Sequence, residues 1–455
     1  MKGLLFTYLV TASGALMALF NPFYGLLAYV ALAVVKPEAM WPWAVTSGRF
    51  SLIVALAMLV GWSYSRRSQI QFGRSGVLVG ILWAYLGWSA FLALFASDQE
   101  QAWLYVETMA KIVIPFFVGL TTINSTVRIK QLAWTIAICE GYVALEFNRA
   151  YFGGYNQLAE AGFGTLDNNS AAIALVTSLG VTTYLGVSAK HLWVKCLAFG
   201  MTALIGHAVL FSYSRGGMLA MMVAAAVGFL LLPKRPLHYA GFAVVAVMAF
   251  SMASPEIKAR FMSSFSGKQG EREASAQSRV DLWTNCWSEM QLHPIMGCGP
   301  NHFPLVAPKY GWSKGKEAHS LWVQTGAEMG FPGLAILLSF FLVTCVRMWK
   351  LTWRRIELID PWHRVVARMV ITSLAAFVVA AQFVSLESLE MPYFIALLGA
   401  GVLKLNTKFA LDDDGLYPEG IMSHSPGLPA NAGYPGFRKT CSAYPESVAS
   451  FELSR

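Results

Sequence analysis

The sequence predicts an all-α polytopic membrane protein, and three observations lead to this fold class. Of its 455 residues, 56% are hydrophobic and 13% are charged, whereas soluble globular chains carry about 25% charged residues. Apolar runs long enough to cross roughly 30 Å of hydrocarbon recur along the chain. Lys and Arg gather in alternate short connections between these runs. We therefore expect 12 or 13 transmembrane helices and a large periplasmic loop with surface helices.

The expected spans follow one another from the first residues onward. The opening run has no small-residue cleavage pattern and leads through Asn21-Pro22 into a second run, so we expect an uncleaved span. Whether these two short runs are separate helices decides between 12 and 13 spans, and with it the side of the N-terminus. The spans fall near 3–20, 22–36, 50–64, 76–97, 111–124, 132–148, 169–188, 191–212, 214–232, 237–253, 319–346, 364–386 and 388–405.

These spans divide the chain into four parts. We expect N-terminal transmembrane helices in 1–253, a periplasmic loop with catalytic motifs in 254–318 and C-terminal transmembrane helices in 319–405. The last part, 406–455, is rich in Pro, Gly and Ser and cannot bury a core, which predicts a disordered cytoplasmic tail.

The positive charges predict the orientation. Five basic connections, near 66–74, 128–130, 190–195, 234–235 and 347–364, alternate consistently and are assigned to the cytoplasm. Arg215 and the segment 279–319 then share the external side. The net charge of +9 mostly reflects cationic helix ends beside anionic membrane lipid. Nucleic acid is not an expected partner, because the sequence shows no basic patch on a soluble domain.

The turn from Ser212 to Gly217 places an arginine between two apolar runs. An Arg at a helix end commonly extends to the lipid headgroups, which is the structural alternative. The paired glycines, however, allow a ligand to approach closely, and the guanidinium fork suits phosphate oxygens. Arg215 is therefore a candidate for binding a diphosphate headgroup.

The segment from Ser278 to Pro294 predicts an amphipathic helix on the membrane surface. Its apolar residues at helical spacing are Val280, Trp283, Trp287 and Met290. Arg279 would lie in the first turn, where the helix dipole disfavours a positive charge, so an anionic ligand or a salt bridge to Asp281 or Glu273 is expected.

His319 and Glu328 stand at the start of the next span. Histidine accepts a proton near neutral pH and can activate a hydroxyl, although a hydrogen-bonded structural role is the alternative. A carboxylate inside a span is costly unless it is paired, so we expect an Arg or His partner for Glu328.

The six cysteines predict no metal site or cofactor. Cys286 and Cys298 share the external loop, where either a disulfide or two free thiols is possible. The chain has no Cys-x-x-Cys motif and no metal-ligand spacing of His and Cys.

The order of these motifs resembles the bacterial O-antigen ligase and polymerase superfamily. The matching motifs are Ser-Arg-Gly at 214–216, Arg-x3-Trp at 279–283, Pro-x2-Gly-x-Gly at 294–299, Ala-His-Ser at 318–320 and Glu-x-Gly-x2-Gly at 328–333. The early Asn-Pro break, Lys36-Pro37 and the run Asp167-Asn168-Asn169-Ser170-Ala171 are most similar to the branch of O-glycosylation ligases associated with exosortase systems. The family's histidine is often followed by Asn, whereas Ser320 stands here.

The resemblance implies a metal-independent glycosyltransferase of the bacterial inner membrane with a periplasmic site. Such an enzyme transfers a preassembled glycan from undecaprenyl diphosphate to an acceptor hydroxyl on lipid A core, a glycan or a protein. It implies that Arg215 and Arg279 hold the diphosphate and that His319 is the general base. Tyr213, Asn168 and Glu328 are expected to complete the substrate-binding site.

Two other functions remain as alternatives. A polymerase would use the growing glycan itself as acceptor, and the sequence does not separate it from a ligase. A transporter of lipid-linked sugars should show broken helices in corresponding halves of the chain, and no such symmetry is visible.

Overall fold

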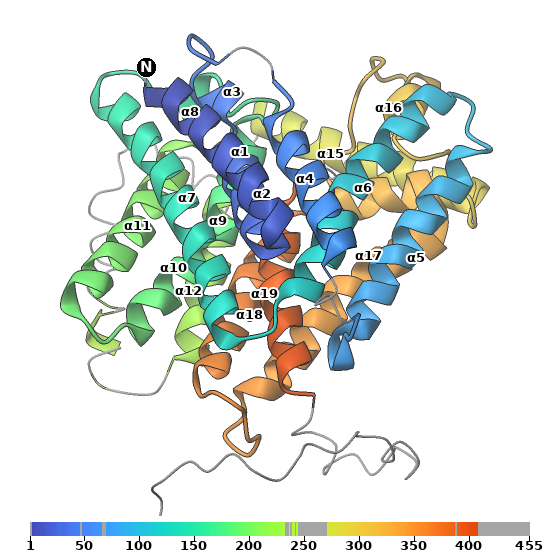
Figure 1. Cartoon of the computed structure of the whole chain (residues 1–455). Coiled ribbons are helices and arrows are strands. Elements are labelled where there is room, and N and C mark those ends of the chain that lie inside the picture. The colour runs from blue at the N-terminus through green and yellow to red at the C-terminus, as the bar shows by residue number, and fades with distance from the viewer. Residues whose placement is uncertain are drawn as a thin grey trace, which may run out of the picture. The chain divides into compact units, whose positions relative to one another are not determined.

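The part of the chain that the structure describes is helical throughout. The computed structural model describes residues 2–45, 48–65, 70–232, 236, 239–241, 243, 271–386 and 389–407, with backbone only for 271–276. Within these residues there is no β-strand, and one isolated bridge joins Phe163 and Leu166. Figure 1 shows the helices packed side by side. The predicted all-α class is confirmed.

The two opening runs form separate helices, α1 (Lys2–Phe20) and α2 (Pro22–Val35). The break falls at Asn21, whose side chain accepts a hydrogen bond from the Phe23 N–H, and Pro22 occupies the first turn of α2. Gly3 packs directly on Trp41, so the start of α1 and the segment after α2 lie at the same end of the helix bundle.

The N-terminal half continues through helices that coincide with the predicted spans. Helix α6 begins well before the predicted span at 111–124, because Asp98 caps it through the Gln101 N–H. The span predicted at 169–188 is divided at Ser178 into α9 and α10. The elements are α3 (Pro37–Met40), α4 (Phe50–Tyr64), η1 (Gly73–Ser75), α5 (Gly76–Ala93), α6 (Gln99–Thr122), α7 (Thr126–Phe152), α8 (Gln157–Glu160), α9 (Asn168–Thr177), α10 (Leu179–Ser188), α11 (Leu192–Phe211) and α12 (Arg215–Leu231).

The C-terminal half consists of one long helix before the last three spans, with short turns between. Its elements are α15 (Glu271–Leu292), α16 (Phe303–Val306), η2 (Ala307–Tyr310), α17 (Leu321–Thr352), α18 (Trp362–Ala380) and α19 (Met391–Leu405). The predicted span at 237–253 lies almost wholly outside the described residues. The predicted tail also lies outside the described residues, except for Asn406 and Thr407. Asn406 is 3% exposed.

Eight described helices or helix pairs are long and apolar enough to cross a membrane, and three shorter apolar helices accompany them. The shorter ones are α4, α12 and α19. Helix α7, which covers the predicted span at 132–148, is not among them and carries several charged residues, including Glu140. The chain is therefore a multi-pass membrane protein.

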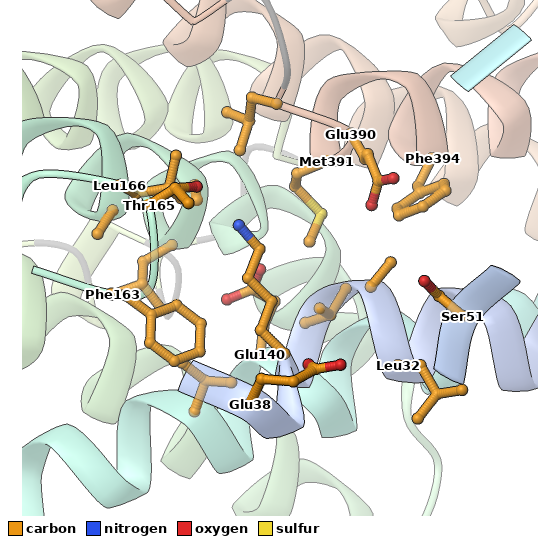
Figure 2. A pocket seen from close by; sticks show the side chains of 18 of the residues that line it. Leu32, Glu38, Ser51, Glu140, Phe163, Thr165, Leu166, Glu390, Met391 and Phe394 are labelled. Carbon is orange, nitrogen blue, oxygen red and sulfur yellow. The ribbon is translucent and has the colours of Figure 1, made fainter. Parts of the chain in front are cut away.

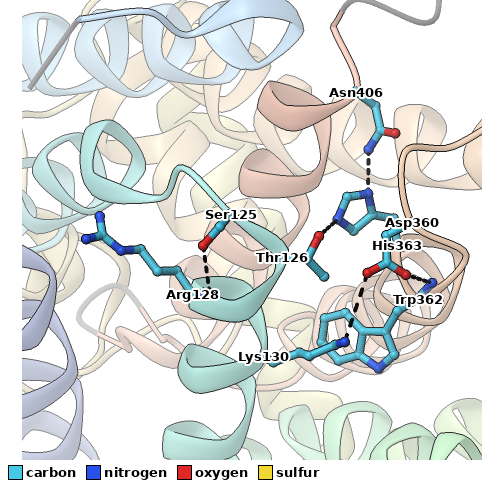
Figure 3. Close-up of polar contacts among 8 residues, drawn as sticks. All are labelled: Ser125, Thr126, Arg128, Lys130, Asp360, Trp362, His363 and Asn406. Carbon is cyan, nitrogen blue, oxygen red and sulfur yellow. Dashed lines mark hydrogen bonds and ion pairs between the residues drawn. The ribbon is translucent and has the colours of Figure 1, made fainter. Parts of the chain in front are cut away.

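Contacts between the predicted cytoplasmic connections place three of these segments together, and Figure 3 shows the contacts between two of them, near 125–130 and 360–363. The buried His363 imidazole donates through Nε2 to Thr126 Oγ1 over 2.8 Å and accepts at Nδ1 from the Asn406 amide over 2.9 Å. Lys130 lies 4.0 Å from the Asp360 carboxylate. The Arg347 guanidinium donates to the Arg74 carbonyl. These basic segments therefore share one end of the helix bundle, as their charge pattern predicts.

Helix α17 is broken at Gly330, where the backbone has φ 69° and ψ −177°. This region of backbone space is essentially restricted to glycine. The break leaves carbonyl groups without helical partners, and three groups from outside the helix bond to them: the Cys298 N–H to Ala327 over 2.9 Å, the Gly299 N–H to Glu328 over 2.9 Å, and the Trp88 indole to Met329 over 3.0 Å. The Pro-x2-Gly-x-Gly and Glu-x-Gly-x2-Gly motifs thus pack against each other.

Candidate active site

The turn between α11 and α12 fixes Arg215 at the first position of a helix. Tyr213 takes a left-handed conformation with φ 55°, which a non-glycine residue rarely adopts. The Ser212 hydroxyl accepts from the Ser214 N–H over 3.1 Å, and the Ser214 hydroxyl caps α12 by accepting from the Gly217 N–H over 3.0 Å. The positive end of the α12 dipole therefore coincides with the Arg215 guanidinium, a combination that favours an anionic ligand.

The start of α9 is attached to this turn. Asn168 donates from its side-chain amide to the Ser212 carbonyl over 3.2 Å. Asp167 caps α9 by accepting from the Ser170 N–H over 2.8 Å. The predicted site residues Asn168 and Tyr213 thus lie on adjoining segments, and two helix N-termini meet beside Arg215.

His319 is held between two fixed neighbours. The Trp283 indole donates to the Ala318 carbonyl over 3.0 Å, and the Ala318 N–H donates to Gln324 Oε1 over 3.0 Å. On the other side, the buried Ser320 caps α17 through the Val323 N–H. Ser320 thus serves as a helix cap at the position where the sequence analysis expects Asn, which is also a good cap. His319 itself has φ 52°, a second left-handed non-glycine residue.

Helix α15 carries Arg279, but not in its first turn. The helix begins at Glu271, eight residues earlier, so the predicted helix start at Ser278 is wrong. The residues from 271 to 277 contain no Gly or Pro to interrupt a helix. The predicted contact of its apolar residues with the membrane surface stays a prediction, and the structure shows which residues pack against the protein. Leu282, Cys286 and Met290 are buried, whereas Val280 and Trp287 are 49% and 50% exposed.

Arg279 lies within electrostatic range of both Arg215 and His319. Partial burial lowers the pKa of Arg279, the Arg215 charge lowers it further, and Asp167 opposes the shift. Among the described side chains Arg279 makes no salt bridge to Asp281, which accepts a hydrogen bond from Gln277, and the side chain of Glu273, the other predicted partner, lies outside the described residues. Across the described residues, neither guanidinium has a hydrogen-bond or ion-pair partner. Two adjacent unpaired guanidiniums form a site suited to a dianionic group such as diphosphate.

The same charges act on the imidazole. Partial burial lowers the pKa of His319, and the positive charges of Lys316 and Arg279 lower it further, while Asp167 raises it. The neutral imidazole is therefore the predominant form at neutral pH, and it has a nitrogen able to accept a proton. The site combines a neutral base with two cations.

Glu328 is completely buried and binds to a loop rather than to an Arg or His in the contacts described. Its carboxylate accepts from the Asn301 N–H over 3.0 Å, from the Phe303 N–H over 3.1 Å and from the Gln324 amide over 3.2 Å. Gln324 in turn accepts from the Ala318 N–H beside His319. Glu328 thus lies one side chain away from the segment that holds His319.

The sequence argument does not select three residues of this region, which are Asp167, Lys316 and His302. Asp167 acts electrostatically on both Arg279 and His319, although the sequence argument selects its neighbour Asn168. Its signal is an Asp immediately before an apolar run, which is typical of a helix cap. No comparable sequence pattern marks Lys316 as a site residue. His302 is buried, accepts from the Asp98 N–H over 3.0 Å, and joins the loop to α6.

Cys286 and Cys298 are both free thiols, Cys286 buried and Cys298 partly buried. Both belong to a small apolar cluster between α15 and the first turns of α17. Of the two forms that the sequence allows, the structure has the pair of thiols.

Comparison with known families assigns two parts of the chain. Residues 200–338 match the family described as O-Antigen ligase, a stretch that contains Arg215, Arg279 and His319. Residues 1–170 match a family of unknown function, DUF5935. No curated protein matches the chain. The O-antigen ligase domain indicates an enzyme of ligase or polymerase type, whose substrates are lipid-linked glycans in general. The predicted exosortase-associated branch is named by neither match and stays a prediction.

Proposed function

We propose that this protein transfers a preassembled glycan from undecaprenyl diphosphate to an acceptor hydroxyl, without a metal ion, at the periplasmic face of a bacterial inner membrane. The observation that carries the proposal is the grouping of Arg215 at the start of α12, Arg279 on α15 and the neutral His319 imidazole just before α17. Among the described residues, neither guanidinium has a hydrogen-bond or ion-pair partner. The matched O-antigen ligase domain supports the same reaction class.

The leaving group determines what the cations contribute. When the bond between the anomeric carbon and the diphosphate breaks, negative charge increases on the phosphate oxygens. Arg215 and Arg279 are positioned in advance to stabilise that charge, and the α12 dipole adds to their field. Because neither side chain must leave a partner among the described residues, little reorganisation is needed when the charge develops.

The imidazole completes the transfer. His319 accepts the proton of the acceptor hydroxyl while its oxygen bonds to the anomeric carbon, so one C–O bond forms as another breaks. The pKa of His319 is lowered by Lys316 and Arg279, which keeps the base unprotonated at the pH of the reaction. The left-handed backbone at His319 is the kind of strain that accumulates at functional positions.

The remaining predicted residues have supporting roles in this proposal. Asn168 and Tyr213 shape the diphosphate site through the turn that carries Arg215. Glu328 acts as a positioning residue, because its described contacts are to the 301–303 backbone and to Gln324. A direct contact of Glu328 with substrate remains a prediction from the sequence.

Product identity tests the proposal and separates ligase from polymerase. Purified protein is incubated with a lipid-linked glycan and, in separate reactions, with lipid A core, a protein or a second glycan as acceptor. A glycan attached once to lipid or protein identifies a ligase, whereas a ladder of longer lipid-linked glycans identifies a polymerase. We expect transfer to continue in the presence of a chelator and to be lost in His319→Ala. Absence of any product with all acceptors, from folded protein, contradicts the proposal.

A further inference from the structure

A second polar site lies inside the helix bundle, apart from the two guanidiniums. It is a cavity of about 280 Å3, near the small end of ligand pockets at about 300 to 1,000 Å3. Its walls come from the ends of α2 and α3, the middle of α7, the segment before α9 and the start of α19. Figure 2 shows the carboxylates of Glu38, Glu140 and Glu390 on different sides of the cavity, with Phe163 and Phe394 among the apolar walls.

Glu140 is the residue that requires an explanation. It is 4% exposed in the middle of α7, where a carboxylate is costly without a hydrogen-bond donor or counter-ion. Within the described part of the chain, no group donates a hydrogen bond to it and no cation lies within ion-pair distance. Lys36 acts on it only over a longer range. A bound donor group in the cavity would satisfy this carboxylate.

The other charges leave the cavity acidic. Glu390 accepts a hydrogen bond from the Tyr29 hydroxyl over 3.0 Å, but the same hydroxyl lies 2.8 Å from the Lys111 carbonyl, and it has one proton for the two acceptors. Lys36 is the single cation lining the cavity, against three carboxylates. With all four groups ionised the lining charge is 1 − 3 = −2, and such an acidic lining favours neutral or cationic donors and disfavours anions.

Two chain segments border both this cavity and the proposed transfer site. Thr165 and Leu166 line the cavity, and the next residue, Asp167, acts on Arg279 and His319. Leu389 and Glu390 also line it, a few residues after Phe383, whose ring lies 6.4 Å from Trp283. A substrate held at the transfer site would thus have this cavity close to it.

We propose that the cavity is a subsite for a single neutral or amino sugar ring of one of the two glycan substrates. This inference rests on the proposed function and adds the substrate chemistry to it. Carboxylates accept hydrogen bonds from sugar hydroxyl or ammonium groups, and the Phe walls can cover the apolar C–H faces of the ring. The three acidic side chains select against a uronic acid.

The test measures sugar binding without transfer. Full-length protein in lipid nanodiscs is examined by saturation-transfer difference NMR with methyl glucoside, methyl glucosaminide and methyl glucuronide. We expect the first two to bind and the glucuronide to bind at least about tenfold more weakly. Glu140→Gln, which keeps the side-chain shape, should weaken glucosaminide binding about tenfold or more. Glu107→Gln is the matched control, because Glu107 is exposed and paired with Lys111 over 2.7 Å, and it should bind like wild type.

Equal binding of glucuronide, or unchanged binding in Glu140→Gln, overturns the proposal. Arg279→Ala should bind the sugars normally even where transfer is lost, so a failure of the proposed function and a failure of the subsite give different results. Steady-state kinetics then identifies the source of the ring. A rise in KM for the lipid-linked donor in Glu140→Gln assigns the cavity to the donor, and a rise in KM for the acceptor assigns it to the acceptor. No change in either KM also overturns the proposal.

Discussion

Replacing Arg279 by alanine should separate function from stability. Among the described residues Arg279 makes no hydrogen bond or ion pair, and its nearest charges include the like charge of Arg215. The substitution therefore removes no hydrogen bond or ion pair within the described part of the chain. It removes half of the cationic charge that the two arginines present to the leaving diphosphate.

The size of the effect follows from the chemistry of that charge. Loss of one preorganised donor to a developing anion typically costs about 10² to 10³ in kcat, or about 2.7 to 4 kcal/mol. We expect a loss of this size in Arg279→Ala. Arg279→Lys should have an intermediate rate, because the ammonium keeps the charge but lacks the bidentate fork. The melting temperature of Arg279→Ala should equal or exceed that of wild type, since one of two like charges is removed.

The assay follows product formation from a lipid-linked glycan by purified protein, with thermal unfolding measured on the same samples. Arg149→Ala is the matched control. Arg149 is an exposed arginine paired with Glu146 over 2.9 Å, and such surface pairs contribute about 0 to 1 kcal/mol, so its rate should be unchanged. A kcat for Arg279→Ala within about threefold of wild type would refute the assigned role. A lost rate accompanied by a clearly lower melting temperature would show a structural effect instead.

Three further predictions concern the surroundings of the site. Lys316→Gln should raise the pKa of His319 toward its ordinary value, because a positive charge that lowers it is removed; the acidic limb of the kcat/KM profile then moves to higher pH, while Lys314→Gln leaves it in place. Glu328→Ala leaves two buried donors, the Phe303 N–H and the Gln324 amide, and the partly buried Asn301 N–H without their acceptor, at about 1 to 3 kcal/mol for each buried donor. The amount of folded protein in the membrane, measured by protease resistance, should therefore fall sharply, and a wild-type level contradicts this. Gly330→Ala should lower the melting temperature, since the backbone strain costs about 1 to 3 kcal/mol and the new Cβ meets the Ile295 carbonyl. Gly80→Ala, at an open position in a helix, should not lower it.

The helices can be predicted from the sequence because each one corresponds to a local run of apolar residues. It also identifies the end of the bundle where Arg215 and His319 lie, since both follow from the alternation of basic connections. The division of 169–188 at Ser178 and the early start of α15 are not visible in composition. Both depend on tertiary packing and on the absence of a clear stop signal, which hydropathy does not encode.

The predicted site differs from the structural one in the partners of its residues. The sequence selects Glu328 as a substrate contact because a carboxylate in a span needs a partner, and the described partners are backbone amides of a loop 27 and 25 residues earlier in the chain. Contacts of this kind depend on how the loop folds back over the broken helix α17. Glu140 escapes notice for the opposite reason. It is a single acid within an apolar run, and only the cavity beside it distinguishes it from an isolated buried carboxylate.

The two sites have opposite charge, and this bears on how one substrate is divided between them. Arg279 and Lys316 act on His319, Arg215 acts on Arg279, and Asp167 is the acidic neighbour of both Arg279 and His319, whereas three acidic side chains and one lysine line the cavity near α7. The proposed donor, a glycan on undecaprenyl diphosphate, has the same division, with two phosphates at one end and sugar rings beyond them. A substrate placed in reverse would set phosphate against Glu140 and Glu390 and hydroxyls against two guanidiniums, which is unfavourable at both ends. The charge pattern would therefore favour one direction of binding, in which the anomeric bond lies between the cations and the acids, close to the imidazole that receives the proton.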